Sequence, residues 1–119
     1  MTKPEITSIL QEMKGFHFSA SDSFKSLGTI AYIDNTFTIK LVQDYACKYL
    51  CLEYTVKDIK DISDSIESIN ERVVAGKYIK NGTDLTLQTF FPLIDKAFIE
   101  QQIGNSIHVI EIMIHICRH

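Results

Sequence analysis

Three side chains close to the C-terminus have the types and spacing of possible metal ligands. His108, Glu111 and His115 stand at positions i, i+3 and i+7, so an α-helix would place all three on one face. Imidazole nitrogens and carboxylate oxygens are ligands that zinc accepts. The spacing matches no established zinc motif, however, and it falls in the most apolar part of the chain. We therefore predict no metal site, and a small-molecule or metal-dependent activity of these three residues is the alternative function.

The cysteines are the second group that could carry chemistry. Cys47, Cys51 and Cys117 are odd in number and match no disulfide framework, so we expect reduced thiols that pack as small apolar groups. Cys47 and Cys51 would face the same side of a strand, and nothing in the sequence brings a histidine to them. The pattern therefore does not indicate a thiol nucleophile, which needs a neighbouring base.

The acidic residues and glycines complete the search for catalytic groups. Five acidic residues crowd one segment: Asp58, Asp61, Asp64, Glu67 and Glu71. On a helix they would form a solvated face, which is our interpretation, or a docking surface for a basic partner, which is the alternative. The five glycines are scattered singly and form no phosphate-binding loop. We predict a protein that is not an enzyme and that uses no cofactor.

The first half of the chain reads as a helix followed by three strands. Apolar residues at helical spacing, Ile6 to Met13, predict a helix that Gly15 ends, and a serine-rich connection over 19–26 follows. Alternating apolar residues then predict strands over 29–33, 37–41 and 46–54, with turns at Asp34-Asn35 and Gln43-Asp44. The third strand is apolar on both faces, because Leu50 and Leu52 alternate with Tyr49 and Cys51. We expect its second face to be covered by a helix, a partner subunit or a ligand.

The second half returns to helical spacing. A stripe from Ile59 to Val73 predicts a helix closed by Gly76, and Asn81-Gly82 predicts the tight turn of a hairpin over 77–88. Pro92 permits another helix start, with a possible break at 104–106. The segment 107–116 is apolar on nearly every side, and we interpret it as a buried helix, with a strand as the alternative.

These elements predict one α+β domain over residues 1–119. Its core would be an antiparallel five-stranded sheet with helices packed on it, in the order α-β-β-β-α-β-β-α. The length of 119 residues suits one core, and 45% hydrophobic with 23% charged residues is typical of a globular chain.

The charge and the hydropathy limit the classes of partner. Twelve basic and fifteen acidic residues give a net charge of −3, without a basic stripe, so we predict no nucleic-acid partner. No uncharged apolar stretch is long enough to cross a membrane, and the first five residues lack the apolar core of a signal peptide. We therefore expect a cytoplasmic protein that does not bind membranes.

One stretch resembles a known family. Residues 66–71, Ile-Glu-Ser-Ile-Asn-Glu, followed by the hairpin from Lys77 to Leu87, are similar to the YbjN-like and type III secretion chaperone-like proteins. The resemblance implies a small dimer with a curved antiparallel sheet that holds another polypeptide or acts as a regulator without enzymatic activity. It also implies structural roles for Asn70, as a helix-end cap, and for the Asn81-Gly82 turn.

We therefore expect a non-enzymatic protein-binding module, chaperone-like or regulatory, that acts as a homodimer and binds another polypeptide. The two-sided apolar strand and the apolar segment 107–116 together exceed what one chain of this size is expected to cover. The predicted partner-binding residues are Tyr49, Cys51, Asp61, Asp64, Ile110 and Ile114.

Overall fold

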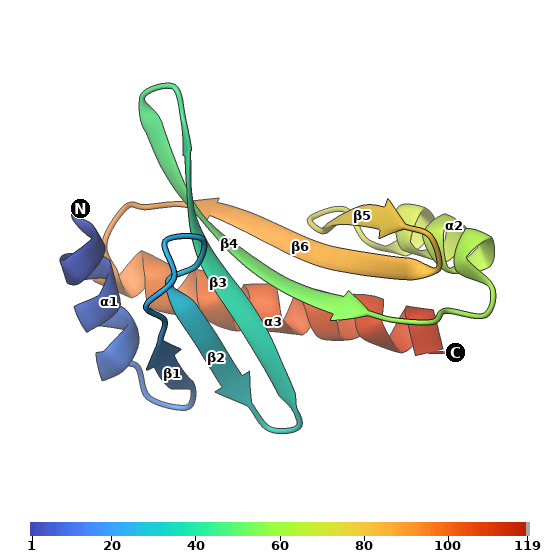
Figure 1. Cartoon of the computed structure of the whole chain (residues 1–119), viewed down its shortest axis with the longest axis horizontal. Coiled ribbons are helices and arrows are strands. Elements are labelled where there is room, and N and C mark those ends of the chain that lie inside the picture. The colour runs from blue at the N-terminus through green and yellow to red at the C-terminus, as the bar shows by residue number, and fades with distance from the viewer. Residues whose placement is uncertain (119) are drawn as a thin grey trace.

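The computed structural model describes residues 1–118 and shows an α+β fold with one antiparallel sheet (Figure 1). Within these residues the elements follow in the order α1 (Lys3–Glu12), β1 (His17–Ala20), β2 (Gly28–Tyr32), β3 (Asn35–Asp44), β4 (Cys47–Val56), α2 (Ile62–Arg72), β5 (Lys77–Asn81), β6 (Asp84–Pro92) and α3 (Lys96–Arg118). The coarse prediction of an α+β class with an antiparallel sheet is confirmed.

The sheet has six strands in the order β1-β2-β3-β4-β6-β5. Every neighbouring pair is antiparallel, and β4 and β6 form the centre of the sheet, with Leu52 opposite Thr89 and Tyr54 opposite Leu87. The helix α2 and strand β5 lie between β4 and β6 in sequence. The two central strands are therefore joined through a long connection, whereas β2, β3 and β4 follow one another through two-residue turns.

The core lies between one face of the sheet and the long helix α3, which crosses behind β4 and β6 in Figure 1. Strand β4 contributes Leu50 and Leu52, and α3 contributes Ile103 and Ile110, all fully buried. Burying an aliphatic side chain of this size contributes about 1.5–3 kcal/mol to folding. We call this side of the sheet the covered face. The helix α1 closes one end of the same core with Ile6 and Leu10, which are also fully buried.

Two helix starts follow the local rules that the sequence suggests. Thr2 caps α1 through a capping box with Glu5, whose pKa is lowered by hydrogen bonds from the side chain and backbone of Thr2. Asp61 caps α2, because its carboxylate accepts a hydrogen bond from the Asp64 backbone N–H at 3.2 Å.

The prediction of a five-stranded sheet is wrong, because the sheet has six strands, and the predicted order of elements lacks β1. The strand β1 lies between the predicted first helix and the predicted first strand and overlaps the serine-rich connection only at residues 19–20; it pairs with β2 through Phe18 and Ile30. Phe18 is 8% exposed, so one apolar side chain anchors this short strand to the core. Gly28 allows the close approach, because a Cβ there would lie 2.1 Å from the backbone oxygen of Ser19. A four-residue strand carries too little alternation to be recognised from its sequence.

Three predicted turns are displaced along the chain. The closing pairs are Tyr32 with Asn35, Asp44 with Cys47, and Asn81 with Asp84, so the turns lie at 33–34, 45–46 and 82–83. The hairpin over 77–88 is confirmed, and its turn begins at Gly82, which has a positive φ of 64°.

The predicted helix boundaries change as well. Pro92 ends β6, and α3 begins at Lys96 and continues through Gly104 without the break expected at 104–106. The segment 107–116 is helical, as interpreted, and not a strand. Asn70 is not the cap of α2, because Val73 holds that position, and Asn70 Oδ1 accepts a hydrogen bond from the Tyr78 hydroxyl at 3.0 Å.

Candidate protein-binding surface

The two faces of the sheet are unlike, and within residues 1–118 no helix packs on the second one (Figure 1). We call this second side the open face. Side chains alternate along a strand, so residues between the core positions of each strand point to it. On the four strands β3, β4, β6 and β5 it comprises Lys40, Val42, Tyr49, Cys51, Glu53, Thr55, Thr86, Gln88, Phe90, Lys77 and Ile79.

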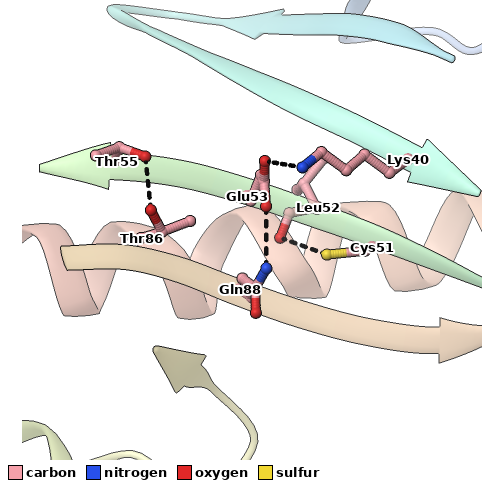
Figure 2. Close-up of polar contacts among 7 residues, drawn as sticks. All are labelled: Lys40, Cys51, Leu52, Glu53, Thr55, Thr86 and Gln88. Carbon is pink, nitrogen blue, oxygen red and sulfur yellow. Dashed lines mark hydrogen bonds and ion pairs between the residues drawn. The ribbon is translucent and has the colours of Figure 1, made fainter. Parts of the chain in front are cut away.

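Polar side chains on the open face are joined across strands, as Figure 2 shows. Glu53 forms a salt bridge of 2.6 Å with Lys40 and accepts a hydrogen bond of 3.0 Å from Gln88 Nε2. The hydroxyls of Thr55 and Thr86 lie 2.9 Å apart and form a hydrogen bond. Cross-strand pairs of this kind stabilise a sheet surface that water reaches on one side. They also fix the outline of the surface that a partner would meet.

Apolar side chains lie at two separate places beside this polar network, and the first is a patch formed by Cys51 and Phe90, which pair across β4 and β6. Ile79 on β5 is the second, because it pairs with Thr86, four residues along β6 from Phe90, and the Lys77–Gln88 pair lies between them. Phe90 is 40% exposed and Ile79 is 55% exposed, whereas Cys51 is only 1% exposed. The Lys77 ammonium lies 5.4 Å from the centre of the Phe90 ring, within the range of a cation–π contact. The patch therefore combines a solvent-facing aromatic ring with a thiol that its neighbours bury.

Burial decides the chemistry of Cys51. Desolvation, followed by the negative charge of Glu53, raises the pKa of its thiol to about 11. A thiol is a nucleophile only as the thiolate, so Cys51 is inert near neutral pH. This agrees with the prediction of a thiol packed as a small apolar group, and Cys117 is half-buried with its pKa also raised by burial. Cys47 departs from that prediction, because it is exposed near the tip of the β3–β4 hairpin.

The end of the β3–β4 hairpin extends away from the rest of the molecule (Figure 1). We call residues 42–49 the arm. Residues 43–48 are exposed, and Tyr45 at the tip is 97% exposed with a positive φ of 51°. A positive φ is costly for a residue with a side chain, and such strain often accompanies a functional contact. Tyr49 lies at the base of the arm, and a hydrogen bond with Cys47 raises the pKa of its phenol.

Asp61 and Asp64 lie at the start of α2, beside a cavity of about 570 Å³. Both are exposed, and the shared hydrogen bond and the charge of Asp61 raise the pKa of Asp64. The cavity is lined by acidic and basic side chains alike: Asp58, Asp61, Asp64, Lys57, Lys60 and Arg118. This mixture differs from the uniformly acidic surface that a basic partner would require.

The three residues of the alternative function, His108, Glu111 and His115, line one groove on the outer side of α3. The groove has a volume of about 370 Å³ and also includes Arg72 from α2. Among residues 1–118 no three His, Cys, Asp or Glu side chains are arranged to hold a metal ion. The helical face is therefore as predicted, but the three side chains do not converge on one point.

Ile110 and Ile114 belong to the core and not to the surface. They are 0% and 5% exposed, and Ile107, Met113 and Ile116 beside them on α3 are also buried. We expected this segment and the two-sided strand together to exceed what one chain covers; for the segment this is wrong, because α3 turns most of its apolar residues toward the sheet and α2 and leaves only Ile112, 41% exposed, as a large exposed hydrophobic side chain. Of the predicted partner-binding residues, Tyr49 and Cys51 lie on the open face, Asp61 and Asp64 lie apart from it, and Ile110 and Ile114 lie beneath the opposite face.

The sequence interpretation missed Phe90, Ile79 and Tyr45. Phe90 and Phe91 are adjacent in a strand, so one of the two had to face away from the core, which is the signal that could have identified the open-face ring. The sequence gives no comparable indication for Tyr45. Its exposure arises because β3 and β4 extend beyond the ends of the neighbouring strands β2 and β6.

Comparisons with protein-family models, with curated proteins and with solved structures gave no match to this chain. The resemblance to the YbjN-like and secretion chaperone-like proteins therefore stays a prediction. None of the helices within residues 1–118 is both long enough and apolar enough to span a membrane.

Proposed function

We propose that this chain is a cytoplasmic, non-enzymatic protein-binding module, chaperone-like or regulatory, that acts as a homodimer and holds another polypeptide on the open face of its sheet. The observation that carries the proposal is a sheet face that no helix within residues 1–118 covers, on which Phe90 and Ile79 expose apolar side chains beside a fixed polar network. Protein interfaces combine an aromatic centre with a polar rim in this way.

The site favours binding over catalysis. Its one buried thiol is held protonated by a pKa of about 11, and its carboxylate, Glu53, is paired with Lys40. A catalytic pair would instead need two titratable groups whose surroundings separate their pKa values, with one of them free to transfer a proton. The open face offers shape and fixed charges to a partner.

A pair of matched charge insertions tests this proposal. Phe90→Asp places a charge at the centre of the open face, and Val74→Asp places the same charge on a side chain that is 100% exposed between α2 and β5. Polypeptides captured from a lysate by the unmodified chain should be lost with Phe90→Asp and retained with Val74→Asp. The captured polypeptide, once purified, should bind the Phe90→Asp chain at least about tenfold more weakly in calorimetry, because a buried unpaired charge is costly. Equal binding by both variants would remove the open face from the proposal.

The alternative function is a small-molecule site in the groove on α3. Its supporting observation is that His108, Glu111 and His115 line one groove with Arg72, which adds a cation to two imidazoles. Arg72 would pair with a carboxylate of a small organic acid, whereas the carboxylate of Glu111 would require a hydrogen-bond donor on the same molecule. Thermal denaturation with a panel of di- and tricarboxylic acids tests it. A rise in the melting temperature that Arg72→Ala abolishes would support it, and no rise with any acid would contradict it.

A further inference from the structure

The arm has an unpaired backbone edge along β3. Pairing of β3 with β2 ends at Ile39, opposite Gly28, while pairing of β3 with β4 continues to Asp44, so no strand within residues 1–118 covers the outer side of residues 40–44. The Ile39 carbonyl accepts a hydrogen bond of 2.9 Å from the Leu27 N–H, which shows that Ile39 directs its backbone groups toward the β2 side. By alternation, Leu41 and Gln43 direct their N–H and C=O groups to the same, uncovered side.

The sequence along this edge is complementary to itself. Residues 40–44 read Lys-Leu-Val-Gln-Asp, with a cation at one end, an anion at the other and Val42 at the centre. If a second copy lies antiparallel across a two-fold axis at Val42, Lys40 of each copy stands opposite Asp44 of the other, and Leu41 stands opposite Gln43. These last two are the residues whose backbone groups face outward, so the register also satisfies four backbone hydrogen bonds.

We propose that a second copy of this chain pairs with the β3 edge of the arm in this register and joins the two sheets. This inference rests on the homodimer in the proposed function and assigns its interface. Exposed strand edges are sites of pairing with another chain, and interfaces with two-fold symmetry use the same surface on both partners. The opposite charges at the two ends of the segment favour this antiparallel register over a parallel one.

The register also accounts for exposed aromatic side chains. Because Gly28 and Leu27 already occupy the outer side of Ile39, the ladder ends at Lys40, and it brings Tyr45 at the tip of each arm to the end of β2 of the other copy, next to the loop over 21–27. Tyr45 is 97% exposed, and Phe24 in that loop is 91% exposed. A five-residue ladder alone is smaller than a stable interface, so contacts between the arm tip and this loop supply the additional area. The dimer is consequently reversible and depends on concentration.

Two proline substitutions on the arm test the inference as a matched pair. Gln43 and Lys48 stand opposite each other on the arm. The backbone N–H of Gln43 points to the unpaired β3 edge. The backbone N–H of Lys48 points to the β4 edge, past Tyr49, the last residue of β4 that pairs with β6. Proline removes an N–H donor at either position without removing a β3–β4 hydrogen bond. In sedimentation equilibrium, Gln43→Pro should weaken dimerisation at least about tenfold, because two hydrogen bonds are lost per dimer. Lys48→Pro should leave the dimer unchanged.

A cross-linking experiment checks the register without relying on proline. In a Cys47→Ser background, Val42→Cys places a thiol on the two-fold axis, opposite its own copy and at a separation that a disulfide spans. Thr38→Cys on the same background is the control, because Thr38 lies on the same face of β3 but away from the axis. Mild oxidation should give a covalent dimer with Val42→Cys alone.

The outcomes separate this inference from the proposed function. A chain that stays monomeric at every concentration, a dimer that Gln43→Pro leaves intact, or equal cross-linking by both cysteine variants would overturn the β3 interface. A monomeric chain that still binds its polypeptide in a manner sensitive to Phe90→Asp would keep the open face as a binding site. A dimer sensitive to Gln43→Pro, combined with no effect of Phe90→Asp on binding, would support the interface and contradict the open face.

Discussion

Strand β4 presents two sets of side chains to two different environments, and the contrast between them shows what each face does. Toward α3 it places Leu50 and Leu52, which are fully buried and make the core. Away from α3 it places Cys51 and Glu53, whose surroundings are neighbouring side chains of the same sheet. The covered face holds its side chains through a packed helix, while the open face holds them through pairing across strands. Stability therefore resides mainly on one side of the sheet, and the binding site that we propose lies on the other.

The largest expected effect comes from the covered face. Leu52→Ala removes a fully buried side chain beneath α3 and leaves a cavity, so the free energy of unfolding should fall by about 2–5 kcal/mol. Chemical denaturation of both chains measures the difference. A loss below about 1 kcal/mol would mean that α3 does not pack tightly on β4, and the contrast between the faces would weaken.

The next effect tests whether Cys51 is buried although it lies on the open face. Burial raises its pKa from 9.0 to about 11, so in this range the folded chain keeps a proton that the unfolded chain releases. The stability contributed by the neutral thiol is present below pH 9 and is lost as the pH rises toward 11, by about 1.4 kcal/mol per pH unit. Denaturation of the unmodified chain and of Cys51→Ala across this range should show the steeper loss only where the thiol is present. Parallel curves would show that Cys51 is open to solvent.

A smaller effect is expected from the polar network. Glu53→Gln removes the negative charge that pairs with Lys40, and the partly exposed position limits the loss of stability to about 1 kcal/mol. The loss should shrink further in high salt, where the ion pair of the unmodified chain is screened. A loss as large as that of Leu52→Ala would mean that the open face contributes as much to the fold as the covered face does.

The smallest effect on stability is expected at Phe90, which should matter for binding instead. Phe90→Ala removes a ring that is 40% exposed together with its contact to Lys77, for a loss of about 0.5–1 kcal/mol in the free energy of unfolding. The same substitution should reduce affinity for the bound polypeptide by more than tenfold if the ring is central to the interface. Calorimetry and denaturation on one preparation compare the two losses, and a larger loss in folding than in binding would reverse our assignment of the residue.

The sequence predicts the parts of this fold that rest on long patterns. The alternation through Phe37, Ile39, Leu50 and Leu52 predicts β3 and β4, and Asn81-Gly82 predicts the β5–β6 hairpin, although the turn itself begins one residue later. The first strand escapes prediction because one buried side chain, Phe18, holds it in place, and no period can be read from a single residue.

The candidate site is predicted less well, for a physical reason. The same apolar residue types occur in the core and in binding surfaces. Residue type alone therefore cannot show that Ile110 belongs to the core and Tyr49 to the open face; that depends on which face the helices cover. The apolar segment 107–116 suggests a surface too large for one chain, yet its buried residues lie on the side of α3 that faces the sheet. Only the packing direction of α3 distinguishes the two cases.

Because α3 follows every strand in sequence, the sheet is synthesised before the helix that covers it. Every strand precedes this helix in sequence, and β6, to which it packs, finds its neighbour β4 only after α2 and β5 have been synthesised. A growing polypeptide on the ribosome therefore exposes the apolar covered face of a complete or partly formed sheet before α3 emerges. A product that stops before α3 would leave the covered face exposed to solvent. Such truncated products should therefore aggregate in the cell and be removed by proteases.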